Sequence, residues 1–221
     1  DDLVQAMGQT AFTARQIGDA ADVLEAMARD KDCCVVLTLA GAMTVAKMGL
    51  VICDLIDSDI VNIVVSTGAL MAHGLVEAVG RSHFRCNPAM SDAQLFAAGY
   101  NRVYDSLEPE INLDRVEEVV QSLLRRWSPK EAVCSWKLNR AIGEHLARTT
   151  RERGILKSAY EKNIPVFVPA FTDSELGIDL ALDNMYYRAR AGLPKLRYEP
   201  FDDFEHFVTL LDAQKRLGLF T

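Results

Sequence analysis

Three short segments of small and hydroxyl-bearing residues are the first places in this sequence where chemistry could occur. They are residues 39–42 (LAGA), 66–69 (STGA) and 172–174 (TDS). Small side chains allow a ligand to approach backbone N–H groups where a helix begins, and a carboxylate such as Asp173 can bind ribose hydroxyls or an amine. Short loops also need small residues, so the pattern alone leaves a purely structural role open.

The remaining candidate residues carry weaker signals. His73 follows the second of these segments by about one helical turn and could either point towards a ligand or lie on a helix surface. His83 and Cys86 have a spacing that could ligate a metal, but no second pair stands near them, so we predict no metal site. The sequence contains neither a G-x-G-x-x-G motif nor a Walker-type loop, so the common dinucleotide and P-loop fingerprints are absent.

The elements that must position these residues follow from hydrophobic patterning. Residues 33–39, 60–65 and 164–168 are apolar runs typical of strands buried on both faces. Residues 102–104 could form a small strand or a turn. Helical spacing covers residues 14–29, 43–56, 69–79, 112–127, 135–148, 154–162, 174–190 and 203–217. This alternation predicts an α/β fold with a parallel sheet, helices on both of its faces, and ligands beyond the carboxyl ends of the strands.

Composition excludes several classes of protein. The 221 residues include 24 basic and 31 acidic side chains, a net charge of −7, and no basic run, which argues against nucleic-acid binding. No uncharged stretch is long and apolar enough for a membrane helix, so we expect no membrane partner. Five cysteines in apolar settings predict reduced thiols and a cytoplasmic location. The chain lacks an initiator Met, and residues 219–221 have the pattern of the start of a strand, so we expect the sequence to be incomplete at both ends.

Four segments carry a resemblance to a known family: LVQAMGQTAFTAR, VVLTLAGAMTVAKMGLVICDLI, VNIVVSTGALMAHGLVEAVG and AYEKNIPVFVPAFTDSELG. The chain resembles deoxyhypusine synthase, and in particular its prokaryotic deoxyhypusine-synthase-like relatives, over essentially its whole length. The resemblance implies that residues 1–221 form a single Rossmann-like NAD-binding domain, apparently truncated at its C-terminus, within a cytoplasmic homotetramer. Enzymes of this family oxidise spermidine with NAD and pass its aminobutyl group through an enzyme lysine to an acceptor amine. The acceptor is a protein lysine, giving deoxyhypusine, or a small diamine, giving homospermidine.

The resemblance also implies roles for particular residues. The cofactor NAD would contact a first loop at Gly41, Ala42, Met43, Thr44 and Val45, a second at Thr67, Gly68 and Ala69, and the carboxylate of Asp173. The substrate-binding candidates are His73, in place of a family glutamate, and Asp179, one position after a family aspartate. These changes remove negative charge from the expected amine pocket. Either Asp179 and Glu175 substitute for it, or this subgroup uses another substrate.

No residue of the chain is assigned as the catalytic lysine. The family places that lysine in a Trp-Gly-Lys context, which we expect to lie beyond Thr221. Trp136 and Lys137 are adjacent and precede Asp173, so Lys137 does not match it. Three hypotheses follow: an NAD-dependent aminobutyl transferase, a catalytically incomplete paralogue or fragment acting as a regulatory or scaffold subunit, and a protein that binds NAD without polyamine chemistry.

Overall fold

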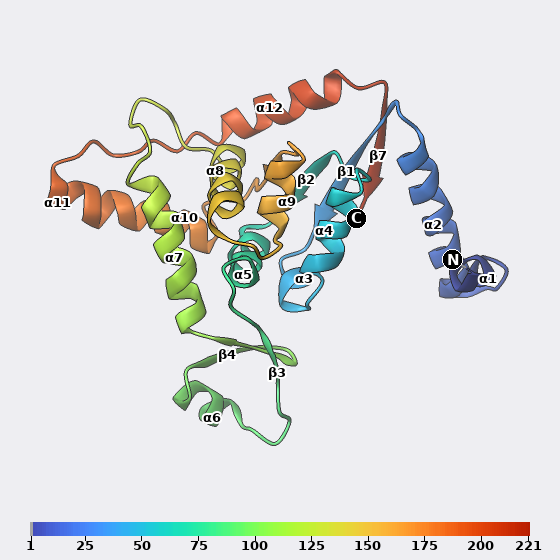
Figure 1. Ribbon diagram of the computed structural model, residues 1–221, viewed down its shortest axis with the longest axis horizontal. Coiled ribbons are helices and arrows are strands. Elements are labelled where there is room, and N and C mark those ends of the chain that lie inside the picture. Colours follow the sequence, from blue (N-terminus) through green and yellow to red (C-terminus); the bar gives the residue numbers. More distant parts are fainter. Residues whose placement is uncertain (1) are drawn as a thin grey trace.

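A parallel sheet of four strands lies at the centre of the computed structural model, which describes residues 2–221 (Figure 1). Its strands are β1 (Cys33–Leu39), β2 (Ile63–Ser66), β6 (Val166–Phe167) and β7 (Arg216–Phe220), in the order β6-β2-β1-β7. The chain moves outward from β1 to β2 and β6, then returns to pair β7 with the other side of β1. The strand order therefore reverses between β1 and β7, the place where open α/β sheets bind ligands.

Helices cover both faces of this sheet. The helices among residues 2–221, not all of which contact this sheet, are α1 (Asp2–Gly8), α2 (Phe12–Arg29), α3 (Ala42–Val45), α4 (Gly49–Asp57), α5 (Gly68–Ala78), α6 (Asp92–Ala97), α7 (Ile111–Leu124), α8 (Ser135–Thr149), α9 (Ile155–Glu161), α10 (Glu175–Leu182), a π-helical turn η1 (Asp183–Arg188), α11 (Ala189–Ala191) and α12 (Phe201–Asp212). None of the helices among residues 2–221 is long and apolar enough to span a bilayer.

The two faces of the sheet form separate hydrophobic cores because side chains alternate along each strand. Leu37 and Val64 belong to the larger core, which includes side chains of α4, α5, α7, α8 and α9. Val36, Ile63 and Phe167 belong to the smaller core, against which α12 packs. Burial of each such side chain contributes roughly 1.5–3 kcal/mol. The predicted class, a parallel sheet with helices on both faces, is confirmed.

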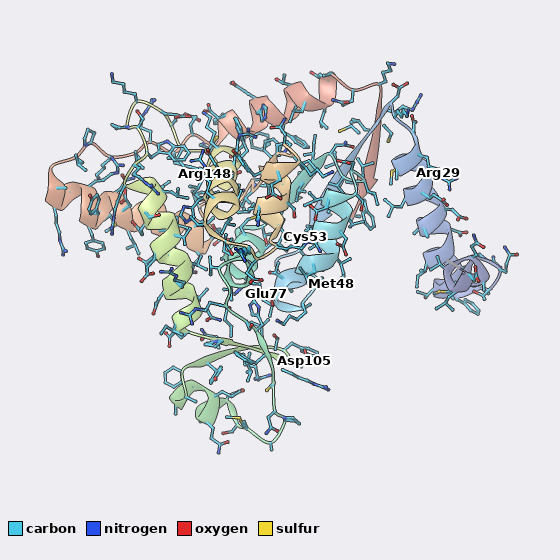
Figure 2. The ribbon with its side chains drawn as sticks, in the orientation of Figure 1. Arg29, Met48, Cys53, Glu77, Asp105 and Arg148 are labelled. Atoms are coloured by element: carbon cyan, nitrogen blue, oxygen red, sulfur yellow. The ribbon has the colours of Figure 1, made fainter. Side chains whose placement is uncertain are left out.

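A second, antiparallel sheet lies apart from the first and was largely missed by the sequence analysis. It contains β3 (Phe84–Arg85), β4 (Tyr100–Val103) and β5 (Ser106–Pro109), in the order β3-β5-β4. Figure 2 shows Asp105, between β4 and β5, beyond the end of α5 that carries Glu77. Only residues 102–104 had a strand-like pattern. Strands of two to four residues are too short to show a period of alternation.

Several predicted boundaries were wrong. The last helix ends at Asp212 rather than residue 217, and β7 begins at Arg216. Basic residues followed by Gly resemble a helix end, but Arg216 pairs with Asp30 beside β1. The predicted helix 43–56 is divided into α3 and α4 at Lys47, whose φ is +65°. The predicted helix 174–190 is interrupted by the π-helical turn η1.

Candidate functional site

The loops that follow β1 and β2 touch at the carboxyl edge of the sheet. A Cβ atom added to Gly41 would lie 2.8 Å from the Ala69 Cβ and 2.9 Å from the Thr67 Oγ1. These distances are too short for any side chain at position 41, so glycine is needed for the close approach. The structure thus brings the first two predicted cofactor loops together.

The loop after β6 joins them through Gly68. A Cβ atom added to Gly68 would lie 2.0 Å from the Cβ of Ser174. The Ser174 hydroxyl donates to the Phe171 carbonyl at 2.5 Å and accepts from the Gly177 N–H at 3.3 Å, which holds the loop against the start of α10. Asp173 precedes this serine and is exposed to solvent. Three segments far apart in sequence therefore meet at one edge.

The first turn of α5 faces this meeting point. The N-cap residue Thr67 makes no capping hydrogen bond through its side chain, and Ala69 is exposed. An α-helix leaves its first N–H groups without intrahelical partners and carries partial positive charge at that end. With glycines at positions 41 and 68 keeping the backbone close, this edge has the general features of an anion-binding site at a helix N-terminus.

Two residues of the first predicted loop face inward. Thr44 is 1% exposed, and its hydroxyl donates to the Leu70 carbonyl at 3.5 Å. Val45 is also buried, whereas Ala42 is exposed and Met43 is half-buried. Residues 41–43 are consequently the part of this loop that a ligand can reach directly.

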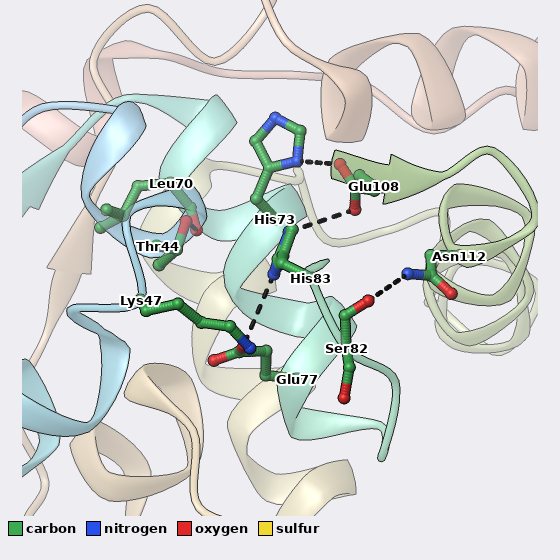
Figure 3. A network of polar contacts seen from close by, with 9 residues as sticks. All are labelled: Thr44, Lys47, Leu70, His73, Glu77, Ser82, His83, Glu108 and Asn112. Carbon is green, nitrogen blue, oxygen red and sulfur yellow. Dashed lines mark hydrogen bonds and ion pairs between the residues drawn. The ribbon is translucent and has the colours of Figure 1, made fainter. Parts of the chain in front are cut away.

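His73 lies one turn further along α5 and contacts a buried carboxylate that the sequence analysis missed (Figure 3). Its Nδ1 is 2.6 Å from Oε2 of Glu108, which comes from β5 and is 1% exposed. The buried His83 lies between two carboxylates, with Nε2 3.5 Å from Glu108 Oε1 and Nδ1 3.4 Å from Glu77 Oε1. Glu77 also pairs with Lys47. We call His73, His83 and Glu108 the His–Glu cluster.

The charges within the His–Glu cluster compensate one another. Burial raises the pKa of Glu108, but contacts with His73 and His83 outweigh burial and bring that pKa down to about 2. Burial lowers the pKa of His83, but Glu108 and Glu77 outweigh it, so the net shift is upward. Glu108 is thus ionised. It lies beside His83, whose raised pKa favours the protonated, positively charged imidazole. It does not restore the free negative charge of the family glutamate expected at position 73.

Asp179 lies in the packing between α10 and α7 rather than at an open surface. Its side chain is buried, its Oδ2 has no partner, and its backbone carbonyl accepts a hydrogen bond from Gln121 at 2.9 Å. Burial, reinforced by Glu117 and Glu175, raises the pKa of Asp179 to about 7. A carboxyl group in this environment is easily protonated and supplies little charge to an amine near neutral pH.

The environment of Lys137 is unfavourable for a nucleophilic amine. Its Nζ lies 2.8 Å from Asp202 Oδ2, and this hydrogen bond raises the pKa of the amine. A lysine that forms a Schiff base needs a lowered pKa instead.

The His–Glu cluster had almost no signal in the sequence. His83 was considered only with Cys86, whose thiol instead donates to the carbonyl of Asn87 at 3.7 Å. Glu108 lies in a short strand and reaches His73 only through the fold of the antiparallel sheet.

Comparisons with known proteins agree with this architecture. The family model described as deoxyhypusine synthase matches residues 2–221. The chain is 30% identical over 220 residues to "Probable deoxyhypusine synthase 2" of Methanosarcina acetivorans, covering 99% of this chain and 61% of that protein. It is 30% identical over 186 residues to "Deoxyhypusine synthase-like protein" of Coxiella burnetii, covering 83% of this chain and 53% of that one. The chain therefore spans between about half and three fifths of the length of these relatives.

A solved structure from Entamoeba histolytica, from the same family by its description, has the same fold. Its TM-score is 0.70 at 15% identity, and the match covers 99% of this chain and 75% of that one. The family model extends over all the described residues. The chain belongs to the deoxyhypusine synthase family.

Proposed function

We propose that this protein uses NAD to transfer an aminobutyl group from spermidine to an amine acceptor, and that residues 2–221 form its NAD-binding domain. The observation that carries the proposal is the meeting of the loops after β1, β2 and β6, through Gly41 and Gly68, at the carboxyl edge of the parallel sheet. Membership of the deoxyhypusine synthase family supports the reaction class. Because the chain spans only part of the length of its relatives, the whole reaction is part of this proposal.

Each part of the carboxyl edge has a role in holding the cofactor. The backbone of residues 41–43 and the first turn of α5, with Thr67, Gly68 and Ala69, would bind the pyrophosphate. The exposed carboxylate of Asp173 would accept hydrogen bonds from ribose hydroxyls. Thr44 and Val45 would support the loop from within the core. NAD supplies the hydride acceptor for oxidising the substrate and the donor for reducing the product.

His73 and Asp179 are our candidates for binding the substrate. The side chain of His73, in the middle of α5, is 23% exposed. The side chain of Asp179 is buried in α10, so it would reach a substrate only if α10 moved. The acceptor is a protein lysine or a small diamine. No lysine among the described residues matches the family's catalytic context.

The exposed apolar side chains of the first two helices, α1 and α2, support assembly of the protein into a homotetramer. Helices α1 and α2 pack on each other and lie to one side of the sheet (Figure 1). Their side chains Leu3, Phe12, Ile17 and Val23 are exposed, with Phe12 91% accessible. Apolar groups of this size favour burial against another subunit.

The cysteines support a location for the protein. All five are free thiols, which fits a reducing, cytoplasmic setting.

The proposal is tested in two steps on the full-length protein. Calorimetry should first detect binding of NAD. Spermidine labelled in its aminobutyl part should then transfer label to a protein lysine or a diamine only when NAD is present. Failure to bind NAD would overturn the assigned edge. NAD binding without label transfer would favour a protein that binds NAD without polyamine chemistry.

A further inference from the structure

We propose that the His–Glu cluster binds a divalent transition metal, with zinc as the favoured ion. The three side chains come from two parts of the fold: His73 from α5, and His83 and Glu108 from the segment that builds the antiparallel sheet. One potential ligand atom from each residue lies within 4.8 Å of the other two. Figure 3 shows the three side chains converging between α5 and β5.

The cluster contains three buried polar atoms without hydrogen-bond partners. They are His73 Nδ1, His83 Nε2 and Glu108 Oε1. His73 Nδ1 lies 2.6 Å from Glu108 Oε2 and His83 Nε2 lies 3.5 Å from Glu108 Oε1, so the carboxylate contacts both rings as ion pairs. Buried polar atoms are normally satisfied, and an unsatisfied one costs about 1–3 kcal/mol. A cation shared by the three side chains would satisfy them together.

The spacing suits a small ion. Zinc binds histidine nitrogen and carboxylate oxygen at about 2.0–2.2 Å in a tetrahedral arrangement, which separates ligand atoms by roughly 3.4 Å. His83 Nε2 and Glu108 Oε1 are 3.5 Å apart. His73 Nδ1 lies 2.6 Å from the other oxygen of the same carboxylate, and the three residues' ligand atoms lie within 4.8 Å of one another.

The outer partners of His83 provide a second, independent observation. Histidines that ligate a metal through one nitrogen usually direct the other towards a carboxylate, which fixes the ring and its tautomer. The Nδ1 of His83 lies 3.4 Å from Glu77 Oε1, and Glu77 is in turn paired with Lys47. This leaves Nε2 of His83 directed into the cluster.

The donor set selects the class of metal. Two imidazole nitrogens and one carboxylate suit zinc and neighbouring transition metals, whereas calcium and magnesium prefer oxygen ligands alone. Three protein ligands leave a fourth position for water or another ligand. The partly exposed side chain of His73 gives an ion a route into the cluster.

Metal titration tests the proposal directly and without NAD or polyamine, so its outcome is separate from that of the proposed function. The full-length protein, freed of metal with a chelator, is titrated with Zn²⁺ by calorimetry and with Co²⁺ by visible absorption. We expect one equivalent to bind, with d–d bands of four- or five-coordinate Co²⁺ that Zn²⁺ displaces. Absence of stoichiometric binding to the wild-type protein would overturn the proposal.

Zn²⁺ affinities of single-residue variants show whether the ion binds at the His–Glu cluster. His73→Gln and Glu108→Gln should each weaken Zn²⁺ binding at least tenfold, and Glu77→Gln should weaken it about 10- to 100-fold through loss of the outer partner. His145→Gln, a histidine of α8 outside the cluster, is the matched control and should bind like wild type. Because the side chain of His73 is partly exposed, His73→Gln is the variant best tolerated by the fold. Unchanged affinity in both His73→Gln and Glu108→Gln would show an ion bound elsewhere and would overturn the proposal.

Discussion

Nδ1 of His73 lies 2.6 Å from Oε2 of Glu108, a contact that joins the helix after β2 to the second sheet. The resemblance predicted a loss of carboxylate at the position of His73. The fold places the carboxylate of Glu108 beside that position. Contacts with His73 and His83 lower the pKa of Glu108 to about 2. The environment of His73 therefore differs from an open acidic pocket, a property that the residue type at position 73 does not reveal.

Gly68 should not tolerate even a methyl group. In Gly68→Ala, the new Cβ would lie 2.0 Å from that of Ser174, so the loops must separate. We expect NAD affinity to fall at least tenfold, or about 1.4 kcal/mol. The double variant Gly68→Ala/Ser174→Gly should recover part of the loss, because it removes the clashing Cβ. Equal NAD affinity in wild type and Gly68→Ala, measured by calorimetry, would argue against a cofactor at this edge.

Asp173→Ala should weaken NAD binding about tenfold, because a carboxylate that accepts hydrogen bonds from ribose hydroxyls contributes about 1–2 kcal/mol. Its side chain is exposed, so the melting temperature should stay within a degree or two of wild type. Asp212→Ala, at the end of α12, is the matched control. Unchanged NAD affinity in Asp173→Ala would remove this residue from the site.

Asp179 should make stability depend on pH. Burial raises its pKa in the folded protein from 3.8 to about 7, so between these values the folded chain holds a proton that the unfolded chain releases. The free energy of unfolding should therefore fall as pH rises from about 4 to 7, by up to about 4 kcal/mol from this residue.

Asp179→Asn removes this titration while nearly preserving the shape of the side chain. Urea unfolding should show wild type and variant similar at pH 4, with the variant gaining relative stability as pH rises to 8. The control Asp212→Asn should follow wild type at every pH. A difference between wild type and Asp179→Asn that does not change with pH would contradict the prediction.

Asp203 should be more important for stability than its neighbour Asp202. Buried Asp203 accepts hydrogen bonds from the N–H groups of Ser135 and Trp136, both at 2.9 Å, and from the Ser135 hydroxyl at 3.0 Å. That hydroxyl also accepts from the N–H of Val168, just after β6, at 2.8 Å. Asp203→Ala should therefore destabilise the fold by about 3 kcal/mol, since it leaves several buried donors unpaired.

The matched control is Asp202→Ala, which loses only the partly exposed ion pair with Lys137. Its cost should be below about 1 kcal/mol. Similar midpoints of urea unfolding for the two variants would show that the contact of α12 with α8 does not stabilise the sheet.

Local patterns were sufficient to predict three of the four parallel strands and the loops that follow them. The apolar runs around Val36, Val64 and Val166 predicted strands buried on both faces, because only such strands lack alternation. The small residues after them, with Asp173 after the third, were predicted to meet at one edge because parallel strands end on the same side.

Contacts between distant segments were decided only by the tertiary structure. Glu108 reaches His73 through strands too short to show a period, and Asp203 caps α8 from a helix near the other end of the chain. Arg216 begins a strand because β1 offers a free edge and Asp30 an opposite charge, although the local sequence resembles a helix end. Hydrophobic periodicity specifies which face of an element is buried. The pairing of polar groups depends on which elements pack together, and that arrangement is a property of the whole fold.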